Sequence, residues 1–88
     1  MYVRPPHVAY AASGDGVVVL DMESGEHVGL PAHAGRIWDL VLAHGEPEAV
    51  VAALAAEYPD ADPAVIAADV AALLDRLVDG GLLHRVEH

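Results

Sequence analysis

The fold of this chain is decided by the stretch Val17-Val-Val-Leu-Asp-Met-Glu-Ser-Gly-Glu-His-Val-Gly-Leu-Pro31, which is followed closely by Gly35-Arg-Ile-Trp38. The pattern predicts a strand, a tight turn, a very short strand at His27–Leu30 that Pro31 ends, and then the start of a helix. We see no later strand that would pair with the far side of His27–Leu30. An unpaired sheet edge is either an aggregation hazard or a docking site. We therefore expect the function to depend on this edge.

The residues before and within this stretch predict a small sheet. Val8–Ala12 has the composition of a first strand, and Ser13-Gly-Asp-Gly16 that of the turn after it. Val17–Leu20 is a continuous apolar run, which favours a central strand with little exposed on either face. Because proline cannot donate to a β ladder, Pro5-Pro6 predicts an irregular arm over Met1–Pro6. Strands in a row joined by short turns predict an antiparallel meander.

Three helices are expected after the sheet, at about residues 32–44, 47–58 and 63–79. Glycine or proline bounds each of them. The third has the clearest start, because Asp62 is placed as its N-cap and a proline follows at the first helical position. Gly80-Gly81 stops it.

The order of these elements defines a fold class. Residues 82–86 predict a short extended tail packed back on the core, and helical spacing places Trp38 in that core. We predict a single α+β domain over residues 1–88 with a winged-helix-like arrangement, in which a three-stranded antiparallel sheet is followed by three helices.

The third helix has two apolar faces. One face is a sufficient core stripe by itself and carries Ile66, Val70, Leu74 and Leu77. An adjoining face is partly apolar and partly charged and carries Val65, Asp69, Ala72, Leu73 and Arg76. This second face either packs under the first strand or the tail, or it forms one side of a groove whose other wall is the third strand.

The open strand edge favours the groove. An extended peptide would bond to the backbone of the third strand and point alternate side chains at the third helix. In this interpretation Asp69 and Arg76 fix the register of the peptide through charged or polar pairs. The predicted peptide-binding residues are Glu26, His27, Val28, Gly29, Leu30, Pro31, Val65, Asp69, Ala72, Leu73 and Arg76.

The amino-acid composition limits the kinds of partner that the chain is expected to bind. Lysine is absent, and the formal net charge is -10. Such a chain repels phosphate backbones and anionic membrane surfaces, and it attracts a basic partner, unless the acidity serves solubility alone. There is no cysteine, no apolar run long enough to span a membrane and no signal-peptide pattern, so a cytoplasmic location is expected.

Nothing in the sequence predicts catalysis. The six histidines lack metal-ligand spacing, so neither a metal site nor another cofactor is expected. The only serines, Ser13 and Ser24, lie in turns without a base beside them, and the glycines at 14 and 16 precede a strand and not a helix. We predict that the protein is not an enzyme.

The same residues resemble the PqqD-like family of precursor-peptide recognition elements. The resemblance is carried by a pattern of apolar and glycine positions from about residue 8 to 83, found in Val17-Val-Val-Leu-Asp21, Ser24-Gly25, Val28-Gly-Leu30, Gly35-Arg-Ile-Trp38 and Asp69-Val-Ala-Ala-Leu-Leu-Asp-Arg-Leu-Val78 with Gly80-Gly-Leu-Leu83. It implies a winged-helix-like fold. It also implies that the leader segment of a ribosomally made precursor peptide adds as a strand beside the third strand, against the third helix.

The sequence leaves two alternatives for the enzyme that receives the peptide. The short, acidic chain is most similar to freestanding members of lasso-peptide pathways, which hand the leader to a separate transglutaminase-like cysteine protease. The alternative is a peptide chaperone of the PQQ pathway that acts with a radical-SAM enzyme.

Two other functions compete with peptide binding. A winged helix that binds DNA should carry basic residues on its recognition helix, whereas the third helix here carries Arg76 against Asp69, Asp75 and Asp79. Self-pairing of the open edge would instead give a weak dimer. No nucleic-acid or membrane partner is expected, and the protein is expected to be a monomer or a weak edge-strand dimer.

Overall fold

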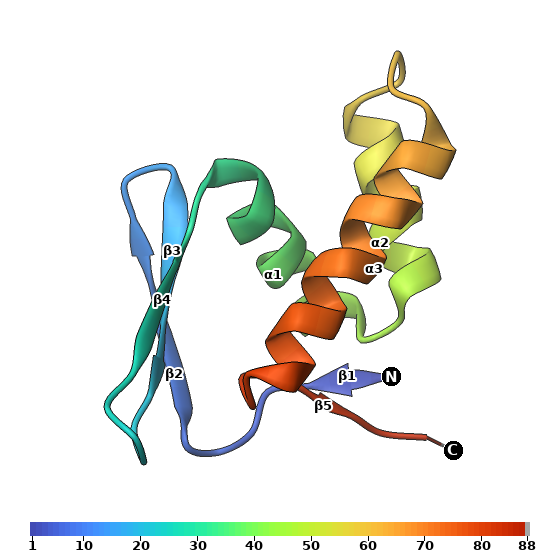
Figure 1. Cartoon of the computed structure of the whole chain (residues 1–88). Coiled ribbons are helices and arrows are strands. Elements are labelled where there is room, and N and C mark those ends of the chain that lie inside the picture. Colours follow the sequence, from blue (N-terminus) through green and yellow to red (C-terminus); the bar gives the residue numbers. More distant parts are fainter. Residues whose placement is uncertain (88) are drawn as a thin grey trace.

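The computed structural model describes residues 1–87, and its elements follow the predicted order (Figure 1). The α+β prediction is confirmed, since a three-stranded antiparallel sheet precedes three helices, with one short strand added at each end of the chain. The elements are β1 (Tyr2–Val3), β2 (Val8–Ser13), β3 (Gly16–Asp21), β4 (His27–Leu30), α1 (Ala32–His44), α2 (Pro47–Glu57), α3 (Pro63–Asp79) and β5 (His84–Arg85).

The main sheet has the order β2-β3-β4, with both pairs antiparallel. Side chains alternate across β3, so Val17 and Val19 are buried on the side that the helices cover. Leu20 points to the other face and is 37% exposed. The prediction that β3 is covered on both faces was therefore wrong, because the helices pack on one face only (Figure 1).

Two glycines allow the close packing of this sheet with α1. A Cβ at Gly16 would lie 2.0 Å from the carbonyl oxygen of Leu30, where β3 and β4 meet. A Cβ at Gly35 would lie 3.2 Å from Val17. A side chain at Gly16 would separate β3 from β4, and one at Gly35 would separate α1 from β3, so this close packing requires glycine at both positions.

Helix α1 fills the centre of the molecule, between the sheet and the α2–α3 pair (Figure 1). Trp38 is fully buried there, as predicted, and the Tyr10 ring meets its indole edge-on at a centroid distance of 5.6 Å. The predicted core stripe of α3 is also buried. The Asp62 side chain caps α3, since its Oδ1 accepts from the Ala64 N–H at 2.9 Å. Among residues 1–87, no helix is long and apolar enough to cross a membrane.

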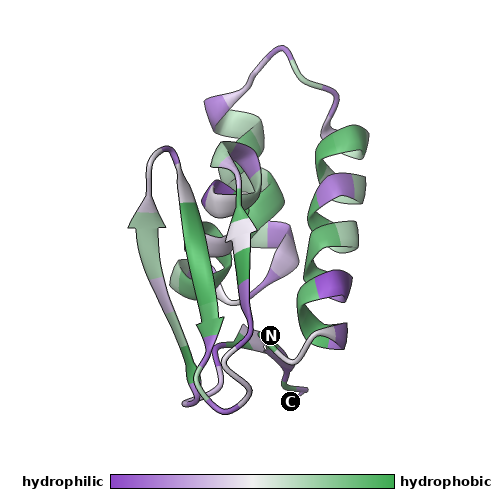
Figure 2. Cartoon of the chain, turned by 60° about the vertical axis from the view of Figure 1, so that its left-hand side comes forward, coloured by the Kyte–Doolittle hydropathy of each residue, from purple (hydrophilic) through white to green (hydrophobic). Residues whose placement is uncertain are grey.

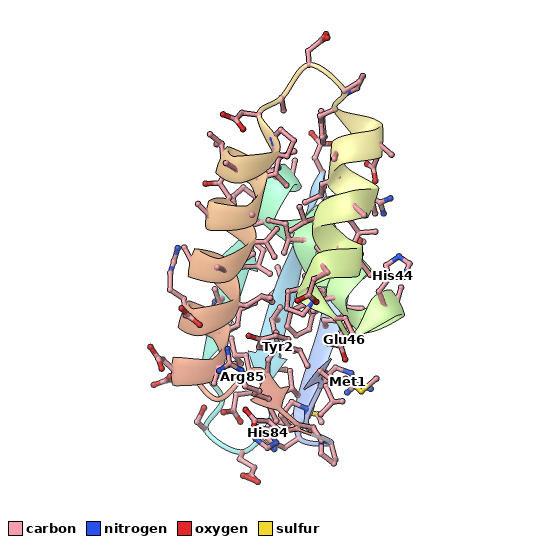
Figure 3. The ribbon with its side chains drawn as sticks, turned by 90° about the vertical axis from the view of Figure 1, so that its right-hand side faces the viewer. Met1, Tyr2, His44, Glu46, His84 and Arg85 are labelled. Atoms are coloured by element: carbon pink, nitrogen blue, oxygen red, sulfur yellow. The ribbon has the colours of Figure 1, made fainter. Side chains whose placement is uncertain are left out.

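The two chain ends form a second, two-stranded sheet at the base of the molecule (Figure 3). The prediction of an irregular arm over residues 1–6 was wrong, because β1 lies before Pro5-Pro6 and pairs with β5. Tyr2 is buried, and Arg85 Nη2 donates to its hydroxyl at 2.7 Å. The tail packs back on the core as predicted, since Leu82 and Leu83 are buried.

Candidate functional site

Strand β4 leaves one backbone edge open within the described chain, because its ladder partner there is β3 and the C-terminal tail pairs with β1 instead. The Asp21 N–H donates to the Glu26 carbonyl at 2.8 Å. Hydrogen bonds in an antiparallel ladder alternate, so the register places the backbone groups of Val28 and Leu30 toward β3. The N–H and C=O groups of His27 and Gly29 consequently point outward.

Helix α3 lies alongside this open edge. Figure 2 shows β4 next to α3, and residues of both line one cavity; in Figure 1 the two elements run in opposite chain directions. The helix that packs closely on β4 is α1, not α3. A groove therefore remains between strand and helix.

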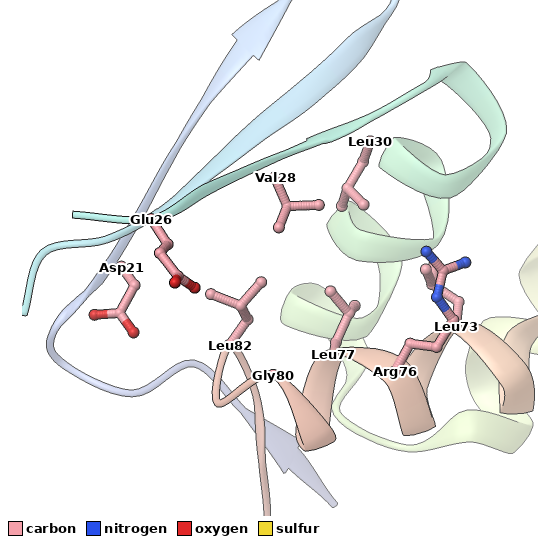
Figure 4. A pocket seen from close by; sticks show the side chains of 9 residues that line it. All are labelled: Asp21, Glu26, Val28, Leu30, Leu73, Arg76, Leu77, Gly80 and Leu82. Atoms are coloured by element: carbon pink, nitrogen blue, oxygen red, sulfur yellow. The ribbon is translucent and has the colours of Figure 1, made fainter. Parts of the chain in front are cut away.

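The groove contains a cavity of about 160 Å³. Strand, helix and tail all contribute to its lining (Figure 4), which consists of Asp21, Glu26, Val28, Leu30, Leu73, Arg76, Leu77, Gly80 and Leu82. Val28 is 39% exposed, whereas the leucines of the lining are buried in the core. An apolar surface of this kind, bordered by charged groups, is typical of a small ligand site.

The charges of the lining lie at the two ends of the groove. In Figure 4 the carboxylates of Asp21 and Glu26 stand at the end where β4 begins, and the Arg76 guanidinium stands at the other end, near Leu30 and Leu73. Val28, Leu77 and Leu82 lie between them. The groove is thus apolar in the middle and of opposite charge at its ends.

The Asp21 carboxylate is held by the turn that follows β3. Its Oδ1 accepts from the backbone N–H of Glu23 at 2.9 Å and of Ser24 at 3.3 Å. The Glu23 bond is the main reason that the pKa of Asp21 lies below its ordinary value. Desolvation opposes this effect, and Ser24 and His7 make smaller contributions that lower the pKa further. Asp21 therefore keeps its negative charge below neutral pH.

The structure brings together some of the residues that were predicted as the site. Cavity-lining members of that set are Glu26, Val28, Leu30, Leu73 and Arg76. His27 and Gly29 supply the outward backbone groups and are exposed, and Pro31 is the N-cap residue of α1. The members that lie on α3 outside the cavity lining are Val65, Asp69 and Ala72.

Asp69 has a partner of its own. Its Oδ2 lies 3.9 Å from Nε2 of His33, so this contact joins α3 to the first turn of α1. Both side chains are about half exposed. The predicted role of Asp69 in setting the register of a peptide remains a prediction.

Sequence reasoning missed four lining residues, namely Asp21, Leu77, Gly80 and Leu82. Leu77 was assigned to the core stripe, and it serves both the core and the cavity. Leu82 reaches the groove because its N–H bonds to the Leu77 carbonyl at 2.9 Å, which folds the chain back after the helix. Within residues 1–87 no cluster of three or more potential metal ligands is present.

The fold and the groove define a small α+β protein with an open strand edge facing a helix. The profile of the family "Coenzyme PQQ synthesis protein D (PqqD)" matches residues 16–83, and the chain belongs to this family. No curated protein gives a significant match.

Two solved structures are similar over nearly the whole chain. One is TbiB1 in complex with the TbiA(beta) leader peptide, at 32% identity and a TM-score of 0.83, covering 97% of this chain and 98% of that one. The other is lasso peptide synthetase B1 complexed with the leader peptide, at 28% identity and a TM-score of 0.85, covering 96% and 98%. Both were solved with a leader peptide bound.

Proposed function

We propose that this chain is a recognition element that binds the leader segment of a ribosomally made precursor peptide in the groove between β4 and α3. The observation that carries the proposal is the open β4 edge beside an apolar cavity with charged ends. The leader peptides in both matched complexes support it.

The peptide enters as a fourth strand of the main sheet. Its backbone pairs with the outward groups of His27 and Gly29, and alternate side chains point at α3. Side chains that enter the cavity meet Val28, Leu77 and Leu82. The backbone bonds supply sequence-independent affinity, and the cavity supplies selectivity.

The bound leader is then delivered to a separate processing enzyme. The matched lasso peptide synthetase B1 favours a lasso pathway, with a leader peptidase of the transglutaminase-like cysteine type as the recipient. The alternative is transfer to a radical-SAM enzyme of the PQQ pathway, the pathway that the family description names. In either case the chain acts as an adaptor that holds the substrate.

Blocking the open edge tests the proposal. His27→Pro removes an outward N–H and places a ring on the edge, while the bonds of β4 to β3 remain. The probe is the TbiA(beta) leader peptide, which is bound in one of the matched complexes; it is fluorescently labelled, and its affinity is measured by anisotropy. We expect His27→Pro to weaken binding about tenfold or more, because a backbone bond is lost and the approach is obstructed.

Two controls make the result specific. His27→Ala keeps the backbone N–H and should bind normally. Ala12→Pro obstructs the opposite edge of the sheet, on β2, and should also bind normally, with circular dichroism verifying both folds. Equal affinity of His27→Pro and the parent protein would exclude strand addition at β4.

A further inference from the structure

Arg76 differs from the other arginines of the chain, which are Arg4, Arg36 and Arg85. Arg4 donates to the Val8 carbonyl, Arg36 holds Glu57 through its Nη2 at 2.7 Å, and Arg85 donates to Tyr2. Within residues 1–87, Arg76 forms no hydrogen bond or ion pair from its side chain, and it lines the groove. A cation on a groove wall without a partner is a site for an anionic group of a ligand.

The opposite end of the groove has the complementary property. The Glu26 carboxylate has no ion-pair partner in the described chain, and it stands beside Asp21 in the lining (Figure 4). Asp21 is held in place by the turn and keeps its charge. This end is suited to a lysine or arginine of a ligand.

The strand direction converts these two ends into an order of residues. The chain runs from Glu26, the residue before β4, at the acidic end to Leu30, the last residue of β4, at the Arg76 end (Figure 4). A strand added antiparallel to β4, which continues the pairing of the sheet, therefore starts near Arg76 and finishes near Glu26. Side chains opposite Leu30, Val28 and Glu26 point at α3, since these positions alternate along the strand.

We propose that the groove selects peptides by a charge order, in which an acidic residue faces Arg76, an apolar residue two positions later enters the cavity beside Val28, and a basic residue two positions after that faces Glu26 and Asp21. The pattern is Asp or Glu, any residue, apolar, any residue, Lys or Arg, from the N-terminus to the C-terminus of the peptide. This inference rests on the proposed function and adds the sequence class of the bound segment.

Selection from a displayed library of random twelve-residue peptides on the immobilised full chain tests the pattern. We expect the parent protein to enrich the acid–apolar–base order. The double variant Glu26→Lys with Arg76→Glu should enrich the inverted order, base–apolar–acid. Synthetic peptides of the two orders, identical in composition, should differ about three- to tenfold in affinity for the parent protein, as two partly exposed pairs permit. Added salt should reduce that difference.

The outcomes separate the charge order from peptide binding itself. Two outcomes overturn the inference and leave the proposed function standing. In one, apolar peptides are enriched without any charge order, and His27→Pro abolishes this enrichment. In the other, the parent protein and the double variant enrich the same charge order. If no peptides are enriched, or if His27→Pro enriches the same peptides as the parent protein, the groove is not the peptide site. This outcome contradicts both the charge order and the proposed function. Circular dichroism of each variant verifies that the fold is kept.

Discussion

At the scale of single residues, exposure separates the side chains that hold the groove together from those that meet a ligand. Leu73 lines the cavity but is only 8% exposed, and it belongs to the core. Truncating a core leucine costs about 2–5 kcal/mol, so a charged residue there would damage the fold together with the site. Val28 also lines the cavity, and at 39% exposed it has less to do with stability.

Val28→Asp should therefore remove peptide binding and leave the protein folded. A carboxylate in the apolar middle of the groove loses solvation when a peptide covers it, so we expect affinity to fall by at least about tenfold. The change in unfolding free energy should stay within about 1 kcal/mol, as for most partly exposed sites. Titration of the leader and urea denaturation measure the two effects.

Leu20→Asp is the matched control. Leu20 is 37% exposed on the face of the sheet that the helices do not cover. The Leu20→Asp variant should lose as little stability as Val28→Asp and keep the full affinity of the parent protein for the leader peptide. If both variants lost affinity equally, the binding face would not be the one beside α3.

At the scale of elements, an exposed ion pair links α1 to α2. Arg36 Nε and Nη2 both donate to the Glu57 carboxylate, with the Nη2 bond at 2.7 Å. The Arg36 side chain lowers the pKa of Glu57, and this effect outweighs slight desolvation. The groove itself does not contain this pair, so the pair bears on stability alone.

The sign of the pH dependence follows from that direction. A carboxyl whose pKa is lower in the folded than in the unfolded state stabilises the fold at pH values above the unfolded pKa, which is about 4.3 for a glutamate. This stabilisation is lost as the pH falls through the folded pKa. Glu57→Gln should thus be less stable than the parent at pH 7, with the difference shrinking toward pH 3. Urea denaturation at the two pH values measures it. Arg36→Gln should behave in the same way, and a difference independent of pH would exclude the ion pair as its cause.

The elements were largely predictable from sequence, because their signals are local. Asp62 followed by proline fixes the start of α3, and Pro31 fixes the end of β4. The pairing of β1 with β5 was not predictable, since it joins residues at the two ends of the chain and neither segment is longer than two residues. Only part of the cavity lining was predicted. Leu82 was missed because it enters the groove through a turn that no periodicity in the sequence indicates.

At the scale of the whole molecule, the open groove is a consequence of how three layers share one core. The central helix α1 packs on both the sheet and α2, so β4 and α3 lie on either side of it without closing on each other (Figure 1). The terminal segments are tied together, since the Val86 N–H donates to the Met1 carbonyl at 2.7 Å, and Leu82 of the same C-terminal tail lines the groove. The net charge of -10 favours partners with basic segments at long range.

Amide hydrogen exchange on the isotopically labelled protein, with and without the leader peptide, tests strand addition most directly. His27 and Gly29 point their N–H groups outward, so their exchange should be fast in the free protein and clearly slowed in the complex. The amides of Val28 and Leu30, which already bond to β3, should change much less. A complex that forms while His27 and Gly29 continue to exchange at their free rates would contradict the addition of a strand at this edge.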